Sequence, residues 1–173
     1  MRIAQIKEED SGCALDCGES DINRLIQSAY IATLQKQGIA FNAFEDDELV
    51  AQFMLTMHMI GDPDRNAFPV EKRFASVKIE YIAVSRMHQH RGIGTFLMKY
   101  AVKYIRDICA GLPVRFILLD SVQDKAEWYS QFGFCKADPE WKLGYQDDYT
   151  VPMCIDFVNK QDVEEYEERY VGK

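Results

Sequence analysis

The chain has 173 residues, which is enough for one domain with a substantial hydrophobic core. Hydrophobic residues make up 47% and charged residues 28%, as in ordinary globular proteins, and no apolar run approaches the roughly 18 residues of a membrane-spanning helix. The formal net charge of −8 opposes a polyanionic partner, so we expect neither a membrane protein nor a nucleic-acid-binding protein.

The charges are divided unevenly along the chain. Residues 1–48 carry four basic and ten acidic side chains, and residues 138–173 carry the same numbers. Residues 49–137 carry twelve basic and eight acidic side chains. The middle of the chain therefore favours an anionic ligand, whereas both flanks would repel one.

The cysteines and the first residues indicate a reducing compartment. The five cysteines are scattered, form no CxxC pair and suggest no zinc site. The opening residues contain no apolar stretch of the kind found in secretory signals. We therefore expect a cytoplasmic protein with reduced thiols and no bound metal.

Helical and strand patterns alternate from the start of the chain. Apolar residues recur at helical spacing over 20–37, with Gly38 as the expected C-cap. Two strands are expected around the acidic turn Glu45–Glu48, and a loop follows over 61–73. Residues 76–84 then alternate between apolar and polar side chains, which predicts another strand.

The second half of the chain continues this alternation. A helical stripe ends at Gly111, and a buried strand is expected over residues 114–120. A short helix around Lys125–Gln131 and further strand segments follow, and the charged tail 160–173 is expected to be a solvated helix. With no repeat or linker, the sequence predicts a single α/β domain over residues 1–173.

A glycine-containing turn separates the predicted strand from the predicted helix. Gly92 and Gly94 lie where a helix begins, and the first turn of a helix has unpaired N–H groups and a positive dipole end. Glycine lets a bulky anion approach the backbone, and Arg91 adds positive charge. The turn lacks the sequence of a P-loop and the full GxGxxG of a dinucleotide site. From these residues alone, a phosphate cradle and an ordinary turn are both open.

Two motifs together resemble a known enzyme family. The stretch "QHRGIG" at residues 89–94 matches the Gln/Arg-x-x-Gly-x-Gly/Ala signature of the GNAT acetyltransferases, and "WYSQFGF" at residues 128–134 resembles their Tyr-x-x-x-Gly-Phe signature. The resemblance extends over about residues 1–158. It implies the GNAT fold, in which helices flank both faces of a central, mixed and twisted sheet, with acetyl-CoA as the cofactor.

The resemblance also implies which residues bind acetyl-CoA. The acetyl group is expected near the main chain of Ile82, Ala83 and Val84, where the strand splays from its neighbour. The pyrophosphate is expected at the turn formed by Gln89, His90, Arg91, Gly92, Ile93, Gly94 and Thr95. His88 and His90 are interpreted as neighbours of this turn, because no nearby acid or cysteine completes a metal site.

Three residues are candidates for the chemistry. Tyr129 of the second signature is expected to protonate the leaving thiolate, since a phenol stays protonated at neutral pH. The alternative is that Tyr129 is simply a core aromatic. Glu80 or His58 is a candidate base for the amine; the alternatives are that Glu80 pairs with Lys78 or lines the substrate pocket and that His58 is a structural histidine. A third alternative is that no dedicated base exists, because an α-amino group is partly neutral. Cys17 has no activating base nearby in the sequence, so a small buried thiol is favoured over a nucleophile.

Three alternatives remain for the molecule that accepts the acetyl group. The favoured one is a primary amine of a small molecule or peptide. The segment "LDCGESDINRLI" resembles the GNAT toxins that acetylate aminoacyl-tRNA, but the acidity of this chain departs from a tRNA-binding protein. The third alternative is a module that binds acyl-CoA without turnover. The oligomeric state is not indicated, and a homodimer is one possible assembly.

Overall fold

The computed structural model describes residues 1–12, 15–61, 73–137 and 149–158 and the single positions 161, 165, 168 and 169. Cys13, most of the expected loop over 61–73 and most of the expected tail helix over 160–173 therefore lie outside the described residues. The elements in chain order are β1 (Arg2–Gln5), η1 (Glu8–Asp10), α1 (Ser20–Leu34), β2 (Ile39–Glu45), β3 (Glu48–Gly61), β4 (Arg73–Val84), η2 (Arg86–His88), α2 (Ile93–Cys109), β5 (Val114–Val122), η3 (Gln123–Lys125), α3 (Ala126–Ser130), β6 (Cys135–Lys136) and β7 (Thr150–Asp156).

The strands form one seven-stranded sheet in the order β1-β2-β3-β4-β5-β7-β6. Strands β4 and β5 run parallel, and the other neighbouring strands run antiparallel. The sheet is therefore mixed, as expected. No helix among the described residues has both the length and the apolar character needed to cross a bilayer.

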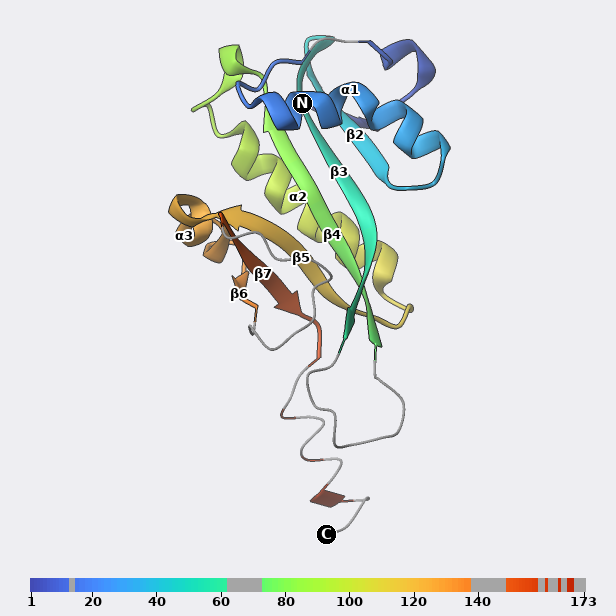
Figure 1. The fold of residues 1–173 in the computed structure, drawn as a ribbon, viewed down its shortest axis with the longest axis vertical. Coiled ribbons are helices and arrows are strands. Elements are labelled where there is room, and N and C mark those ends of the chain that lie inside the picture. Colours follow the sequence, from blue (N-terminus) through green and yellow to red (C-terminus); the bar gives the residue numbers. More distant parts are fainter. Residues whose placement is uncertain are drawn as a thin grey trace.

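Helices cover both faces of the sheet (Figure 1). On one face, Leu97, Ala101 and Ile105 of α2 are fully buried against the sheet. On the other face, α1 buries Ile26 and Ala29 in a second, smaller core. The apolar residues of each helix recur at three- and four-residue spacing, so each presents one apolar stripe to the sheet. The predicted layering of helix, sheet and helix is confirmed.

The end of α1 differs from the prediction. The helix is capped by Gln35, and the residue in the left-handed region is Lys36, with φ 59°. Gly38 serves a different purpose, because a Cβ built on it would lie 2.5 Å from Met54 Cε and 2.7 Å from the Leu55 carbonyl oxygen. The glycine therefore permits the start of β2 to approach β3 closely.

Strand β1 was not predicted from the sequence. It has four residues at the edge of the sheet, paired with β2 from Arg2↔Phe44 to Gln5↔Phe41. A four-residue strand has too few positions to give a clear alternating pattern. Its place is decided by its pairing with β2, which follows it by more than thirty positions in the sequence.

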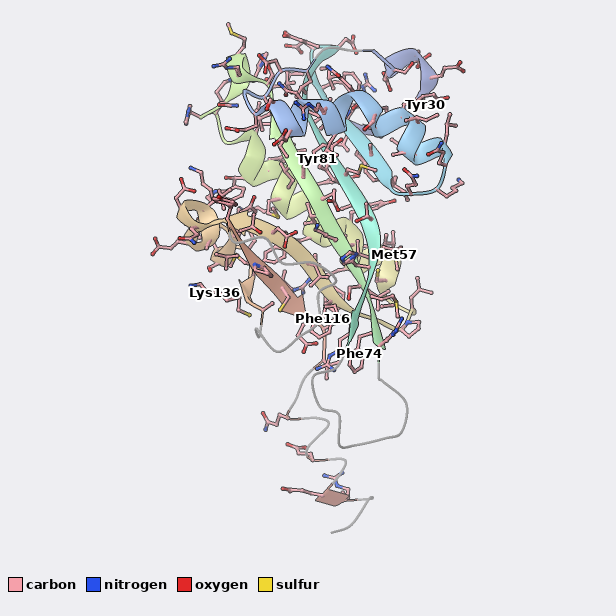
Figure 2. All side chains as sticks on the ribbon, viewed as in Figure 1. Tyr30, Met57, Phe74, Tyr81, Phe116 and Lys136 are labelled. Atoms are coloured by element: carbon pink, nitrogen blue, oxygen red, sulfur yellow. The ribbon has the colours of Figure 1, made fainter. Side chains whose placement is uncertain are left out.

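The pairing of β4 with β5 stops partway, and this opens a fork in the sheet. The last parallel pair is Lys78↔Leu118, and no pairing of residues 79–84 with β5 follows. Before the fork, Phe74 and Phe116 pack edge to face with centroids 6.2 Å apart (Figure 2). Beyond it, the edge of β4 that faces β5 has no strand partner among the residues that the structure describes, which leaves main-chain groups available there.

Strand β4 also contains a bulge beside the fork. Leu55 of β3 pairs with Ile79 and Met54 pairs with Tyr81, so Glu80 is an extra residue without a register partner. A bulge changes the face on which the following side chains lie. Accordingly, Ile79 and Ile82 both pack on the α2 side, whereas Tyr81 packs on the α1 side.

Candidate active site

An open cleft of about 420 Å³ lies between the end of β4, the start of α2 and the α3 region. It brings the two sequence motifs together, because residues of the glycine turn and of the second signature line the same space. Its lining residues are Ile82, Val84, His88, Gln89, His90, Gly92, Ile93, Gly94, Thr95, Lys125, Trp128 and Tyr129. Most of the predicted cofactor-binding residues are therefore brought together here.

The glycine turn has room for a bulky anion. Gly92 is the N-cap of α2 with φ 82°, and a Cβ built on it would meet no atom within 4 Å. A Cβ on Gly94 would lie 3.8 Å from Val84 Cγ2, facing the cleft. The first intrahelical bond runs from the Phe96 N–H to the Gly92 carbonyl at 3.0 Å, so the preceding N–H groups have no partner within the helix. This arrangement fits a pyrophosphate.

Gln89 shapes the turn through its side-chain amide. Its Nε2 donates to the carbonyl oxygen of Val84 at 3.0 Å and to that of Cys17 at 2.8 Å. These bonds tie the N-terminal segment before α1 to the end of β4. Gln89 thus acts on the cleft by holding its backbone in place.

Two predicted cofactor residues do not line the cleft. The Arg91 Nη2 lies 3.1 Å from Glu45 Oε2 in the turn between β2 and β3. The Ala83 side chain is 3% exposed and packs in the core beneath α1, because neighbouring strand residues alternate between faces. Only the main chain of Ala83 lies along the strand edge at the fork.

Lys125 supplies a positive charge to the cleft and was not predicted as a site residue. It is the last residue of η3, directly before α3, and lines the same cleft as the glycine turn. The four-residue spacing between Lys125 and Tyr129 is the available sequence signal, because residues at this spacing share one face of a helix. Trp128 likewise lines the cleft and was not predicted as a site residue.

Tyr129 is held by an aromatic cluster beside the cleft. Its ring packs edge to face on Trp128 at 4.8 Å and on Phe134 at 6.3 Å between centroids. No hydrogen bond to its hydroxyl is found among the described residues, so the proton is available to a ligand. Burial raises the pKa of Tyr129 above the ordinary phenol value, so the group stays protonated at neutral pH.

The two candidate bases lie away from the cleft lining and near each other. Glu80 accepts a hydrogen bond from Thr56 Oγ1 at 3.1 Å on Oε2, and its Oε1 lies 3.3 Å from Lys78 Nζ. His58 lines a small cavity with Lys78 and Asp120, with room for about one water molecule. Neither residue is among those that line the cleft with Tyr129.

Cys17 and His88 make contacts within the protein that fit structural roles. The Cys17 thiol donates to Asn23 Oδ1 at 3.1 Å, and an amide oxygen does not activate a thiol as a base would. His88 Nε2 lies 3.8 Å from Glu48 Oε1. Within the part of the chain that the structure describes, no group of three or more potential ligands could hold a metal ion.

Comparison with known families agrees with this geometry. The profile of the Acetyltransferase (GNAT) family matches residues 3–134, so the chain belongs to the GNAT acetyltransferase family. It is accordingly an acetyl-CoA-dependent N-acetyltransferase by family. No protein among the curated sequences matches it significantly.

Solved structures with the same fold include several toxins. A structure described as a bacterial toxin has a TM-score of 0.70 at 16% identity, covering 98% of this chain and 97% of that chain. The toxin AtaT complexed with acetyl-methionyl-tRNAfMet has a TM-score of 0.66 at 15% identity, covering 95% and 98%. A KacTA–DNA complex has a TM-score of 0.65 at 15% identity, covering 97% and 98%. At these identities, the likeness establishes the shared GNAT fold.

Proposed function

We propose that this chain transfers the acetyl group of acetyl-CoA directly to a primary amine of a small molecule or peptide. The observation that carries the proposal is the position of Tyr129, which lines the same cleft as the glycine turn. Acetyl-CoA supplies the reactive thioester. The glycine turn and Lys125 bind its phosphates, and the unpaired edge of β4 at the fork polarises the carbonyl with a main-chain N–H.

Tyr129 in the cleft and Glu80 at the fork account for the protons. As the new N–C bond forms and the C–S bond breaks, Tyr129 donates its proton to the departing thiolate, which leaves as a thiol. The amine releases a proton, and Glu80 takes it through water. Glu80 is supported over His58 because it lies at the bulge beside the fork, whereas His58 pairs with Ser76 in the closed part of the sheet.

A second candidate acceptor is the α-amine of an aminoacyl-tRNA. It is supported by the likeness to AtaT in complex with acetyl-methionyl-tRNAfMet. A groove lined by Lys99, Lys103 and Arg106 of α2 offers a local surface with a basic excess for a polyanion, although Asp107 also lines it and pairs with Lys103. The net charge of −8 opposes this acceptor, and for that reason we place it second.

Thiol release from acetyl-CoA across a panel of acceptors tests both candidates. The panel contains diamines, a basic peptide, amino-acid amides and mixed aminoacyl-tRNA, with Tyr129→Phe as the matched control. Release that depends on a small amine or peptide supports the first candidate, and release with aminoacyl-tRNA alone supports the second. If calorimetry shows acetyl-CoA binding but no acceptor raises release above the Tyr129→Phe level, the chain is a binding module and the proposal is wrong.

A further inference from the structure

A buried lysine lies between two carboxylates at the fork. The Lys78 side chain is 8% exposed, and lysine is rarely so buried unless it is paired. Its Nζ lies 3.3 Å from Glu80 Oε1 and 2.8 Å from Asp120 Oδ2. The sequence allows the pairing of Lys78 with Glu80, two residues apart, but it does not indicate Asp120, which belongs to neither family motif.

The position of the lysine on the sheet is as informative as its partners. Lys78 forms the last parallel pair with β5, and Glu80 and Asp120 each lie two residues beyond that pair on their own strands. Lys78 therefore bridges β4 and β5 where the strands part. Its neighbours in sequence, Val77 and Ile79, pack in the α2 core, so Lys78 lies on the opposite face.

The same lysine also holds the bulge. Glu80 is the extra residue of the bulge, and Thr56 of β3 lies directly opposite Lys78 in the register. Thr56 binds one carboxylate oxygen of Glu80 and Lys78 binds the other. Side chains from β3, β4 and β5 thus converge on one point, which fixes the orientation of the Glu80 carboxylate.

We propose that Lys78 is a positioning residue for acetyl transfer, which holds the width of the fork and the Glu80 carboxylate by linking it to Asp120. The amine and the thioester meet at this opening, where a displacement of about 1 Å costs on the order of 100-fold in rate. The inference rests on direct transfer to an amine, the function proposed above.

The charge state of the lysine agrees with this role. Burial by itself lowers the pKa of Lys78, but its hydrogen bond with Asp120 and the charges of Asp120 and Glu80 outweigh burial, so the pKa is raised. The ammonium group therefore persists throughout the neutral range. Two carboxylates face this ammonium group, and removing the lysine would leave their like charges without the cation between them.

Four variants test the proposal by kinetics. Lys78→Met and Asp120→Asn should each lower kcat by about 10- to 100-fold on the amine that the native protein acetylates. Acetyl-CoA affinity measured by calorimetry should stay within about threefold, because the glycine turn is untouched. The double variant should be no slower than the slower single variant, since the two single substitutions remove the same linkage.

Lys78→Arg keeps a cation that can bridge both carboxylates and should recover most of the rate. Lys7→Met is the control, because Lys7 forms an exposed pair with Glu9.

Hydrogen exchange of the native protein and Lys78→Met gives a readout that needs no acceptor. Segments 79–84 and 118–122 should exchange at least about tenfold faster in the variant, while the α2 segment 93–109 is unchanged. A native protein that acetylates no amine would contradict the proposed function, and exchange would still decide whether Lys78 holds the fork.

The proposal is overturned if folded Lys78→Met keeps kcat within about threefold of the native value and its hydrogen exchange is the same as that of the native protein. It is equally overturned if kcat falls, acetyl-CoA affinity falls and the α2 segment exchanges faster, all in the same variant. Such a combined change indicates a general loss of stability. If Lys78→Met does not fold, Asp120→Asn decides by the same measurements.

Discussion

At the scale of single residues, the Tyr129 hydroxyl carries the strongest prediction. Tyr129→Phe should lower kcat by about 100- to 10,000-fold, because the proton donor is lost while the transition state needs it most. Acetyl-CoA affinity should change by less than about tenfold. The ring keeps its edge-to-face contacts with Trp128 and Phe134, so thermal stability should be unchanged. A variant that turns over within about threefold of the native protein would make Tyr129 only a packing residue.

The pH dependence of turnover follows from the same side chain. Burial raises the pKa of Tyr129 above its ordinary value of about 10, so the donor is protonated below that pH and is lost as the pH rises through the raised pKa. We expect kcat to hold across neutral pH and to fall only above about pH 10. Rate measurements on Tyr129→Phe provide the comparison, since the variant should lack this high-pH limb within the range where it stays folded.

Gly92 offers a second prediction at the residue scale, and Gly12 provides a matched control. Both have positive φ, 82° and 99°, and both would place a Cβ in open space. Gly92→Val and Gly12→Val should therefore carry similar backbone strain. Only Gly92→Val places a side chain in the cleft, where it displaces the phosphates. Calorimetry should show acetyl-CoA binding lost in Gly92→Val and retained in Gly12→Val; equal affinity in both would rule out the cradle.

At the scale of elements, the acidic turn between β2 and β3 restrains the cofactor turn. Glu45 holds Arg91 at 3.1 Å, away from the cleft lining. Glu45→Gln should release Arg91 toward the phosphates. Because exposed pairs contribute at most about 1 kcal/mol, acetyl-CoA affinity should rise by no more than about fivefold, and less in high salt.

Asp47→Asn is the control for this change, because it removes a charge from the same turn. Asp47 pairs with Arg2 at 3.4 Å, so it does not hold Arg91. Titrations at low and high salt would separate the two variants. If both tighten binding equally, the acidic turn acts only through its overall charge and Glu45 does not restrain Arg91.

At the scale of the whole molecule, the net charge of −8 bears on the acceptor. Binding of nucleic acid depends mainly on phosphate contacts with Lys and Arg, and the basic groove on α2 has only three such residues. We expect no sub-micromolar affinity for tRNA at physiological salt. A gel shift at two salt concentrations checks this. Tight binding that weakens steeply with salt would promote the aminoacyl-tRNA acceptor over the small amine.

The amino-acid sequence by itself determined the order of most elements and the positions of both motifs. These features are local: apolar stripes at helical spacing predicted α1 and α2, and the glycines between a strand and a helix predicted the turn that caps α2. Contacts between distant segments could not be predicted from local patterns. For this reason β1 was not predicted, and Gly38 was wrongly predicted to cap α1.

Only the tertiary structure decided which side chains of the candidate site line the cleft and which contact other parts of the protein. It turned Arg91 toward Glu45, brought Lys125 into the cleft and joined Lys78 to Asp120 across the fork. A local pattern fixes which face of its own element a residue occupies. The charge that it meets there comes from strands and turns tens of residues away, and their arrangement depends on how the whole sheet packs.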